Sequence, residues 1–160
     1  MKILFVCTAN ICRSVMAEAL LRHLLSGNSK SFDVRSAGVH ALSNHRPDEF
    51  TTQICSDHGL DVGSHRSRQL TEQMLDQSDL VLCLAKNHKQ VILSAYPRFK
   101  SKVFLLKEFH RQDAVKNPSV DDPIGRPLRR YEQCYKEIEQ EVKRIAPMLP
   151  EKEKHPRTKP

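Results

Sequence analysis

The sequence predicts an α/β fold in which a single domain is built on a parallel four-stranded sheet with helices on both faces. Four apolar runs rich in β-branched or aromatic residues occupy residues 2–6, 32–36, 80–84 and 103–109. The intervals between them are long enough for crossover helices and carry apolar residues at helical spacing. With 160 residues, 39% of them hydrophobic, the chain has the size of one domain with its own core.

The helices are expected at residues 15–26, 47–58, 71–77, 87–95 and 128–148. In the first of them, Met16, Leu20 and Leu24 fall at helical spacing, and Gly27 supplies a stop signal. Short continuous apolar strands joined by helices are typical of a parallel sheet that is covered on both faces. Ligands bind such sheets beyond the carboxyl ends of the strands, which is where Cys7 falls.

The charge of the chain restricts its possible partners. The formal net charge is +7, which favours anionic ligands. The basic residues are dispersed, however, and the densest groups lack the interleaved aromatic residues of a single-strand platform, which argues against nucleic acid. These groups are Arg126, Arg129 and Arg130, and the tail residues Lys152, Lys154, Arg157 and Lys159.

The five cysteines are an odd number without paired CxxC spacing, which argues against a zinc site and favours a reducing compartment. Cys55, Cys83 and Cys134 fall in apolar or helical patterns and are expected to be packed residues. No apolar run approaches the ~20 residues that span a bilayer, and the N-terminus lacks a signal-peptide pattern. We therefore expect a cytoplasmic protein without a membrane span, metal or cofactor, acting as a monomer or weak dimer.

Residues 1–150 are expected to form the domain, because no internal repeat or low-complexity stretch interrupts them. Residues 151–160 differ in composition: they are charged, contain proline and have no apolar residue able to anchor them. We expect them to form a disordered basic tail.

The string Cys7-Thr8-Ala9-Asn10-Ile11-Cys12-Arg13-Ser14 lies where the first apolar run meets the first expected helix. Backbone N–H groups of such a turn converge on one point, and the helix N-terminus adds partial positive charge. Arg13 offers a planar fork of donors that matches two phosphate oxygens. The same field stabilises a thiolate, so we expect the pKa of Cys7 to be lowered from ~8.5 into the range ~3.5–7.5. The string predicts a phosphate-binding loop with a nucleophilic cysteine.

A thiolate that attacks a phosphate monoester needs a proton donor for the leaving group, since a phenol has a pKa near ~10. The Pro- and Gly-punctuated segment between the last strand and the last helix contains two carboxylates, Asp121 and Asp122. Asp121 is expected to form a turn or to cap the next segment of the chain. Asp122 directly precedes Pro123, which keeps its backbone extended, and it is the candidate general acid.

Across nearly all of residues 1–149 the motifs resemble the low-molecular-weight protein tyrosine phosphatases, with most similarity to the bacterial branch. In order they are CTANICRS from Cys7, MAEAL from Met16, Ser36-Ala37-Gly38, HRSRQL from His65, DLVLC from Asp79, and Asp122-Pro123 before a long final helix. The resemblance implies a hydrolase of phosphotyrosine monoesters in proteins that works through a covalent cysteinyl-phosphate and needs no cofactor.

The resemblance also implies roles for the reacting residues. Cys7 would be the nucleophile, Arg13 the clamp on the phosphoryl oxygens and Asp122 the general acid. As a carboxylate, Asp122 would then activate the water that hydrolyses the intermediate. Cys12 would form a reversible disulfide that shields Cys7 from overoxidation.

The same resemblance implies a set of supporting residues around the loop. Ser14 would hydrogen-bond the Cys7 sulfur and stabilise the thiolate. Asn10, which tolerates a left-handed backbone, would tie the loop to Ser14, Ser36 and His65.

The sequence departs from the family pattern at several positions. Ala9 replaces the usual glycine and Val15 the usual proline, and neither change removes a reacting group. Ile124-Gly125 replaces a tyrosine pair, which removes aromatic walls from the substrate cleft. Ala85 stands where an acidic residue is common. Substrate preference is therefore the least determined property.

Three other functions remain open. A protein-arginine phosphatase on the same scaffold would carry a threonine at the position of Ile11, and Ile11 favours tyrosine. A thiol-coupled arsenate reductase needs two further cysteines close together after the third strand, where the chain has Cys83 alone. A non-catalytic phosphate- or nucleic-acid-binding module would need neither Cys7 nor Asp122.

Overall fold

A four-stranded parallel sheet in the order β2-β1-β3-β4 forms the centre of the computed structural model, which describes residues 1–28 and 32–150. Its strands are β1 (Lys2–Cys7), β2 (Asp33–Gly38), β3 (Leu80–Cys83) and β4 (Val103–Leu105). Each strand overlaps one of the four predicted apolar runs, so the predicted fold class is confirmed.

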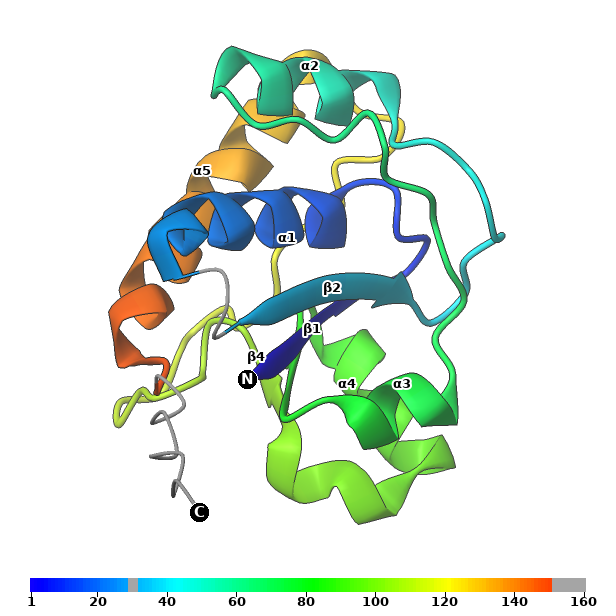
Figure 1. The fold of residues 1–160 in the computed structure, drawn as a ribbon, viewed down its shortest axis with the longest axis vertical. Coiled ribbons are helices and arrows are strands. Elements are labelled where there is room, and N and C mark those ends of the chain that lie inside the picture. The colour runs from blue at the N-terminus through cyan, green and yellow to red at the C-terminus, as the bar shows by residue number, and fades with distance from the viewer. Residues whose placement is uncertain (29–31, 151–160) are drawn as a thin grey trace, which may run out of the picture.

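Helices cover both faces of this sheet (Figure 1). They are α1 (Arg13–Leu24), α2 (Glu49–Asp57), α3 (Glu72–Gln77), α4 (Lys86–Ala95) and α5 (Leu128–Ile145), with short 3₁₀ turns η1 (Ser26–Asn28), η2 (Pro97–Lys102) and η3 (Ala146–Met148). In Figure 1, α1, α2 and α5 lie on one side of the sheet, and α3 and α4 lie on the other.

Strand β1 divides its side chains between two hydrophobic cores. Ile3, Phe5 and Cys7 belong to the core that α1, α2 and α5 complete. Leu4 and Val6 belong to the core beneath α3 and α4. This alternation follows from the period of two in a strand, and it explains why the run is apolar throughout.

The ends of two helices differ from the prediction. The predicted stop at Gly27 is wrong: α1 ends at Leu24, after a last helical bond from Leu25 N–H to Leu21 O at 3.0 Å, and Gly27 lies within the 3₁₀ turn η1 that follows. Helix α5 ends at Ile145, and the last predicted turn is the 3₁₀ turn η3. Pro147 lies in that turn and has no N–H for a further helical bond.

The long connection from β4 to α5 is held in place by a buried lysine. Lys107 is 7% exposed, and its ammonium donates to Asn117 O at 2.9 Å and Ser119 O at 3.0 Å. The next residue, Val120, donates its N–H to Leu84 O at 2.7 Å, just after β3. The segment that carries Asp122 is thus fixed at the carboxyl edge of the sheet.

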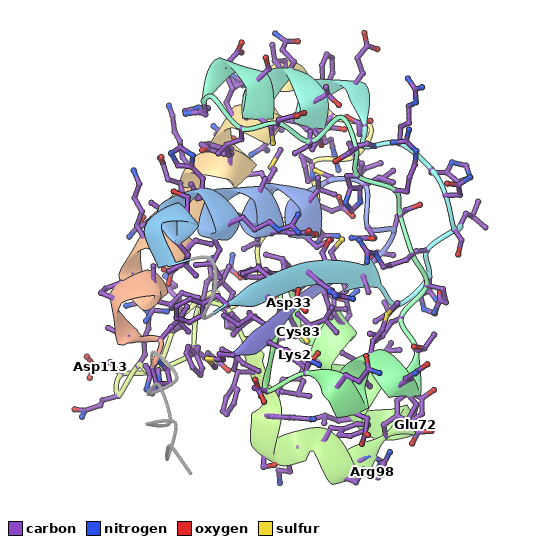
Figure 2. The ribbon with its side chains drawn as sticks, viewed as in Figure 1. Lys2, Asp33, Glu72, Cys83, Arg98 and Asp113 are labelled. Carbon is purple, nitrogen blue, oxygen red and sulfur yellow. The ribbon has the colours of Figure 1, made fainter. Side chains whose placement is uncertain are left out.

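Exposed ion pairs link α3 to η2 beneath the sheet. Arg98 lies 3.1 Å from Glu72 and 3.5 Å from Asp76, and Figure 2 shows Arg98 and Glu72 beside each other. Pairs this exposed contribute only about 0–1 kcal/mol. Among the described residues, no helix has the length and apolarity needed to span a bilayer. The tail predicted for 151–160 lies outside the described residues.

Candidate active site

The loop of residues 7–14 carries the chain from β1 directly into α1. Cys7 ends the strand, Arg13 begins the helix, and the Cys12 carbonyl accepts the first helical hydrogen bonds. Asn10 has a φ of 56°, the left-handed conformation that asparagine tolerates. Ala9 has no positive φ, so alanine in place of glycine introduces no backbone strain there.

Hydrogen-bond donors surround the sulfur of Cys7. Its Sγ lies 2.9 Å from Ser14 Oγ and accepts a hydrogen bond from Asn10 N–H at 3.3 Å. Cys7 is 2% exposed. The family resemblance implied that Ser14 hydrogen-bonds the Cys7 sulfur, and the structure brings these two atoms together.

Burial raises the pKa of the Cys7 thiol above its ordinary value, although Ser14, Arg13 and Asn10 each act to lower it. The lowered pKa expected from the sequence is therefore wrong for this arrangement. Burial explains the difference, because the sulfur is removed from water.

Arg13 and Asp122 form a direct ion pair. Arg13 Nη2 lies 2.6 Å from Asp122 Oδ2, and the arginine side chain is 6% exposed while the aspartate is 45% exposed. Arg13 also donates to Val120 O at 3.1 Å and to Thr8 Oγ1 at 3.4 Å. Asp122 Oδ1 accepts the Ile124 N–H at 3.2 Å. Segments that are more than a hundred residues apart thus meet at one guanidinium.

Asn10 is the centre of a buried polar network. Its amide donates to Ser14 Oγ at 2.9 Å and to Ser36 Oγ at 2.8 Å, and its Oδ1 accepts the Arg68 N–H at 3.0 Å. His65 Nε2 lies 2.9 Å from Asn10 O, and because a carbonyl only accepts, the imidazole donates. Asn10 is fully buried with each polar group partnered, which holds the loop rigidly.

Glu18 is a member of this network that sequence reasoning missed. Ser36 Oγ donates to Glu18 Oε2 at 2.5 Å, and His65 Nδ1 lies 4.0 Å from the same oxygen. Burial lowers the pKa of His65, while Asn10 and Glu18 act to raise it. The available signal was a carboxylate, 6% exposed here, on the apolar face of α1 between Ala17 and Leu20.

Cys12 is buried in the same core as Cys134 of α5. All five cysteines are free and buried, as was predicted for Cys55, Cys83 and Cys134. The Cys12 thiol is hydrogen-bonded to Cys134, and this bond together with burial raises the pKa of Cys12. The disulfide between Cys7 and Cys12 stays a prediction, and Cys134 is a second thiol within reach of Cys12.

His88, in the first turn of α4, also borders the loop, and no motif pointed to it. It is fully buried, and its Nε2 lies 3.0 Å from Thr8 Oγ1. Burial, aided by the nearby charges of Arg13 and His40, lowers the pKa of His88 to about 4. The imidazole is therefore neutral at physiological pH.

We expect His88 to make the free energy of unfolding depend on pH. As the pH falls, the unfolded chain binds a proton near pH 6.5, while the folded protein resists it down to about 4. The stability from neutral His88 is therefore present above pH ~6.5 and is lost as the pH falls toward 4, by about 2–3 kcal/mol. The free energy of unfolding, measured with urea, should fall more for wild type than for His88→Gln, whose side chain does not titrate, as the pH is lowered from ~7 to ~4.5. Equal falls in the two proteins would contradict this expectation.

Gly38 lets β2 pass close behind the loop. A Cβ at this position would lie 2.4 Å from Thr8 O, 2.8 Å from Ala41 Cβ and 3.0 Å from Ala9 C. Because two of these atoms are backbone, we expect Gly38→Ala to displace the loop, destabilising the protein by about 1–3 kcal/mol. The midpoint temperature of thermal unfolding should fall, and any kcat that depends on the loop should fall with it. Gly27→Ala, where nothing lies within 4 Å, is the control.

The described residues contain no group of three or more His, Cys, Asp or Glu side chains placed to hold a metal ion. The arrangement at the loop instead offers a sulfur nucleophile, a guanidinium matched to phosphoryl oxygens and a carboxylate. These are the groups for displacement at phosphorus through a covalent intermediate.

Comparison with known proteins agrees with this chemistry. The model of the family described as low molecular weight phosphotyrosine protein phosphatase matches residues 2–155. A protein-arginine-phosphatase of Bacillus subtilis is 36% identical over 93% of this chain and 97% of its own length. A probable low molecular weight protein-tyrosine-phosphatase, EpsP of Ralstonia nicotianae, is 37% identical over 92% of this chain and 94% of its own.

Solved structures show the same likeness. The YwlE arginine phosphatase with a phosphorylated active-site serine superposes with a TM-score of 0.86 at 36% identity, over 93% of this chain and 95% of that one. The tyrosine phosphatase Wzb of Escherichia coli K30, in complex with sulphate, superposes with a TM-score of 0.82 at 32% identity, over 93% of this chain and 98% of that one. The chain belongs to the low molecular weight phosphotyrosine protein phosphatase family, as its motifs predicted.

Proposed function

We propose that this protein hydrolyses phosphotyrosine monoesters in proteins through a covalent cysteinyl-phosphate on Cys7. The observation that carries the proposal is the convergence of three groups at the carboxyl end of β1. The Cys7 sulfur lies under donors from Ser14 and Asn10, and Arg13 spans the distance from the loop to Asp122.

The first step begins when a phosphoryl dianion reaches Arg13. The guanidinium is engaged by Asp122 at 2.6 Å, and the phosphoryl oxygens compete for the same donors. As Arg13 turns to the phosphoryl group, the Asp122 carboxylate is released and receives the proton that the Cys7 thiol gives up. The proton lost by the Cys7 thiol balances the one gained by Asp122, so the pair reaches its reactive form, thiolate and acid, without net proton uptake.

The thiolate then attacks phosphorus, and the bond to the leaving oxygen breaks. Asp122 delivers its proton to the phenolate as it leaves, since an unprotonated phenolate leaves slowly at neutral pH. In the second step the Asp122 carboxylate accepts a proton from water, which attacks the phosphocysteine and expels the thiolate. The donors from Ser14 and Asn10 stabilise this thiolate both as nucleophile and as leaving group.

A second candidate substrate is phosphoarginine, because two of the relatives are named protein-arginine-phosphatases. Ile11 is the residue that bears on the choice. It lies partly exposed on the loop, and its carbonyl accepts the Asp48 N–H at 2.9 Å. A branched aliphatic side chain at this position suits an aromatic leaving group, whereas a threonine hydroxyl would favour a polar one.

A matched pair of peptides tests the proposal. Wild type is expected to hydrolyse a phosphotyrosine peptide with kcat/KM about tenfold or more above that for the phosphoarginine peptide of the same sequence. Ile11→Thr should reduce this ratio by about tenfold or more. A wild-type preference for phosphoarginine would replace the first candidate by the second, and turnover of neither would overturn both.

The remaining alternatives have less support. An arsenate reductase relay through Cys83 meets a steric obstacle, because Cys83 belongs to the core beneath α3 and α4, while Cys7 and Cys12 belong to the core on the other face of the sheet. A non-catalytic binding module would gain nothing from an ion pair between Arg13 and Asp122. Reduction of arsenate in the presence of thiol would identify an arsenate reductase. Release of phosphate from a phosphopeptide would distinguish an enzyme from a non-catalytic binding module.

We further propose that the enzyme acts in the cytoplasm on phosphoproteins, as a monomer or weak dimer and without nucleic acid. Five free thiols support a reducing compartment. We assign catalysis to residues 1–150, which include every residue of the proposed mechanism.

A further inference from the structure

The imidazole of His88 contacts the loop and has no part in the proposed mechanism. It is fully buried in the first turn of α4, where an aliphatic or aromatic side chain would fill the same space. Its Nε2 contacts Thr8 Oγ1 at 3.0 Å, and its Nδ1 has no hydrogen-bond partner among the described residues. A histidine that uses one nitrogen and leaves the other unpaired needs a reason beyond packing.

The unpaired nitrogen identifies the tautomer. A neutral imidazole carries one proton, on either Nδ1 or Nε2. With the proton on Nδ1, a buried N–H donor would be orphaned, which is rare in folded proteins. With the proton on Nε2, the donor is satisfied by Thr8 Oγ1 and only a lone pair stays unused. His88 therefore donates from Nε2 to Thr8.

This donation determines the direction of the Thr8 hydroxyl. Its oxygen accepts from His88 at 3.0 Å and from Arg13 Nη2 at 3.4 Å, which occupies both lone pairs. The remaining O–H must point away from both donors. Thr8 follows Cys7 directly, and Arg13 is the group that clamps the phosphoryl oxygens in the proposed function. The hydroxyl proton is thus left for another acceptor, beside the guanidinium that would clamp the phosphoryl oxygens.

We propose that His88 is a positioning residue, whose Nε2–H orients the Thr8 hydroxyl as a donor to a phosphoryl oxygen and keeps it beside Arg13. A continuous line runs from Asp122 through Arg13 and Thr8 to His88, with separations of 2.6, 3.4 and 3.0 Å. When Arg13 leaves Asp122 for the phosphoryl group, Thr8 stays in place because His88 anchors it. The donation to a phosphoryl oxygen rests on the proposed function. The hydrogen bond from His88 to Thr8 and its effect on phosphate binding can be tested without turnover.

The test compares wild type with His88→Phe, His88→Gln, Thr8→Val and the His88→Phe/Thr8→Val double variant in the full chain. Nitrogen-15 NMR of the ring nitrogens, assigned by the signal lost in His88→Phe, should show the Nε2–H tautomer in the free protein. Titration with inorganic phosphate should show about tenfold weaker binding in His88→Phe and in Thr8→Val. The double variant should be no weaker than either single one, because both remove the same donor.

His88→Gln separates positioning from packing. Its amide N–H reaches the same distance from the backbone as Nε2 and should restore phosphate affinity to within about threefold of wild type. Gln90→Ala, an exposed change on the same helix, should leave affinity and circular dichroism unaltered. An Nδ1–H tautomer, additive losses in the double variant, or a glutamine variant as weak as the phenylalanine variant would each overturn the inference. Absent turnover in wild type with intact phosphate binding would instead reject the proposed function alone.

Discussion

Replacing Cys7 by serine is expected to reduce turnover of a phosphotyrosine peptide by about 10⁴-fold or more. In the proposed mechanism Cys7 forms the bond to phosphorus, and a serine hydroxyl cannot match a thiolate without a general base beside it. Its neighbours are donors: Ser14 Oγ lies 2.9 Å from the sulfur, and Asn10 contributes an N–H at 3.3 Å. Phosphate binding should persist, because Arg13 and the backbone of the loop are unchanged.

Three measurements check this expectation. Steady-state hydrolysis gives the loss of kcat, and calorimetric titration with inorganic phosphate reports whether the binding loop survives. Mass spectrometry after rapid acid quench should find one phosphoryl group on the peptide that contains Cys7 in wild type. Cys83→Ala is the matched control, since this cysteine is equally buried but lies in the other core, and its kcat should stay within about threefold of wild type. A phosphoryl group on another residue, or a serine variant with more than about one per cent of wild-type kcat, would remove Cys7 from the nucleophile role.

The sequence was sufficient to predict the fold and the residues of the loop. Continuous apolar strands and amphipathic intervals are local properties, so the order of elements could be read directly. Asn10 was expected to tolerate a left-handed backbone, and its φ is 56°. Helix ends were less accurate: α1 ends at Leu24, and Gly27 lies in the 3₁₀ turn η1 that follows it.

Features that depend on tertiary contacts could not be predicted. The pKa of Cys7 was misjudged, because the sequence does not show how completely the folded chain removes this sulfur from water, and that burial raises the pKa. Glu18 reaches the polar network through Ser36 of β2, and His88 reaches Thr8 of the loop, from two helices on opposite faces of the sheet, so no sequence spacing relates them. The Cys12 thiol meets Cys134 across α1 and α5 for the same reason.

Replacing Asp122 by alanine is expected to slow a substrate with a poor leaving group by about 10²–10³-fold, and an activated aryl phosphate by less than about tenfold. The difference is expected because, in the proposed mechanism, Asp122 supplies a proton that a phenolate of tyrosine needs and a nitrophenolate does not. Asp122 is placed for this by its ion pair with Arg13 at 2.6 Å and by the Ile124 N–H at 3.2 Å. The measurement is kcat/KM across a series of aryl phosphates that differ in the pKa of the phenol.

Asp121 provides the control for this experiment. It is a neighbouring carboxylate on the same exposed segment, and it shares the charge but not the contact with Arg13. Asp121→Asn should change kcat/KM by less than about threefold for every leaving group. A steeper dependence on leaving group in the Asp121 variant than in the Asp122 variant would exchange the two assignments, and equal slowing of all substrates by Asp122→Ala would leave the general acid unidentified on this segment.

Asp122→Asn separates the two steps of the reaction. The amide keeps the shape of the side chain, but it can neither donate the acid proton nor take a proton from water. With an activated aryl phosphate the first step needs no acid, so the phosphocysteine should form quickly and hydrolyse slowly. A pre-steady-state burst of phenol, equal in amount to the enzyme, is therefore expected in the asparagine variant. Absence of a burst, together with an unphosphorylated Cys7 in the quenched variant, would mean that the carboxylate serves attack rather than release. Its ion pair with Arg13 would then be the property that matters for catalysis.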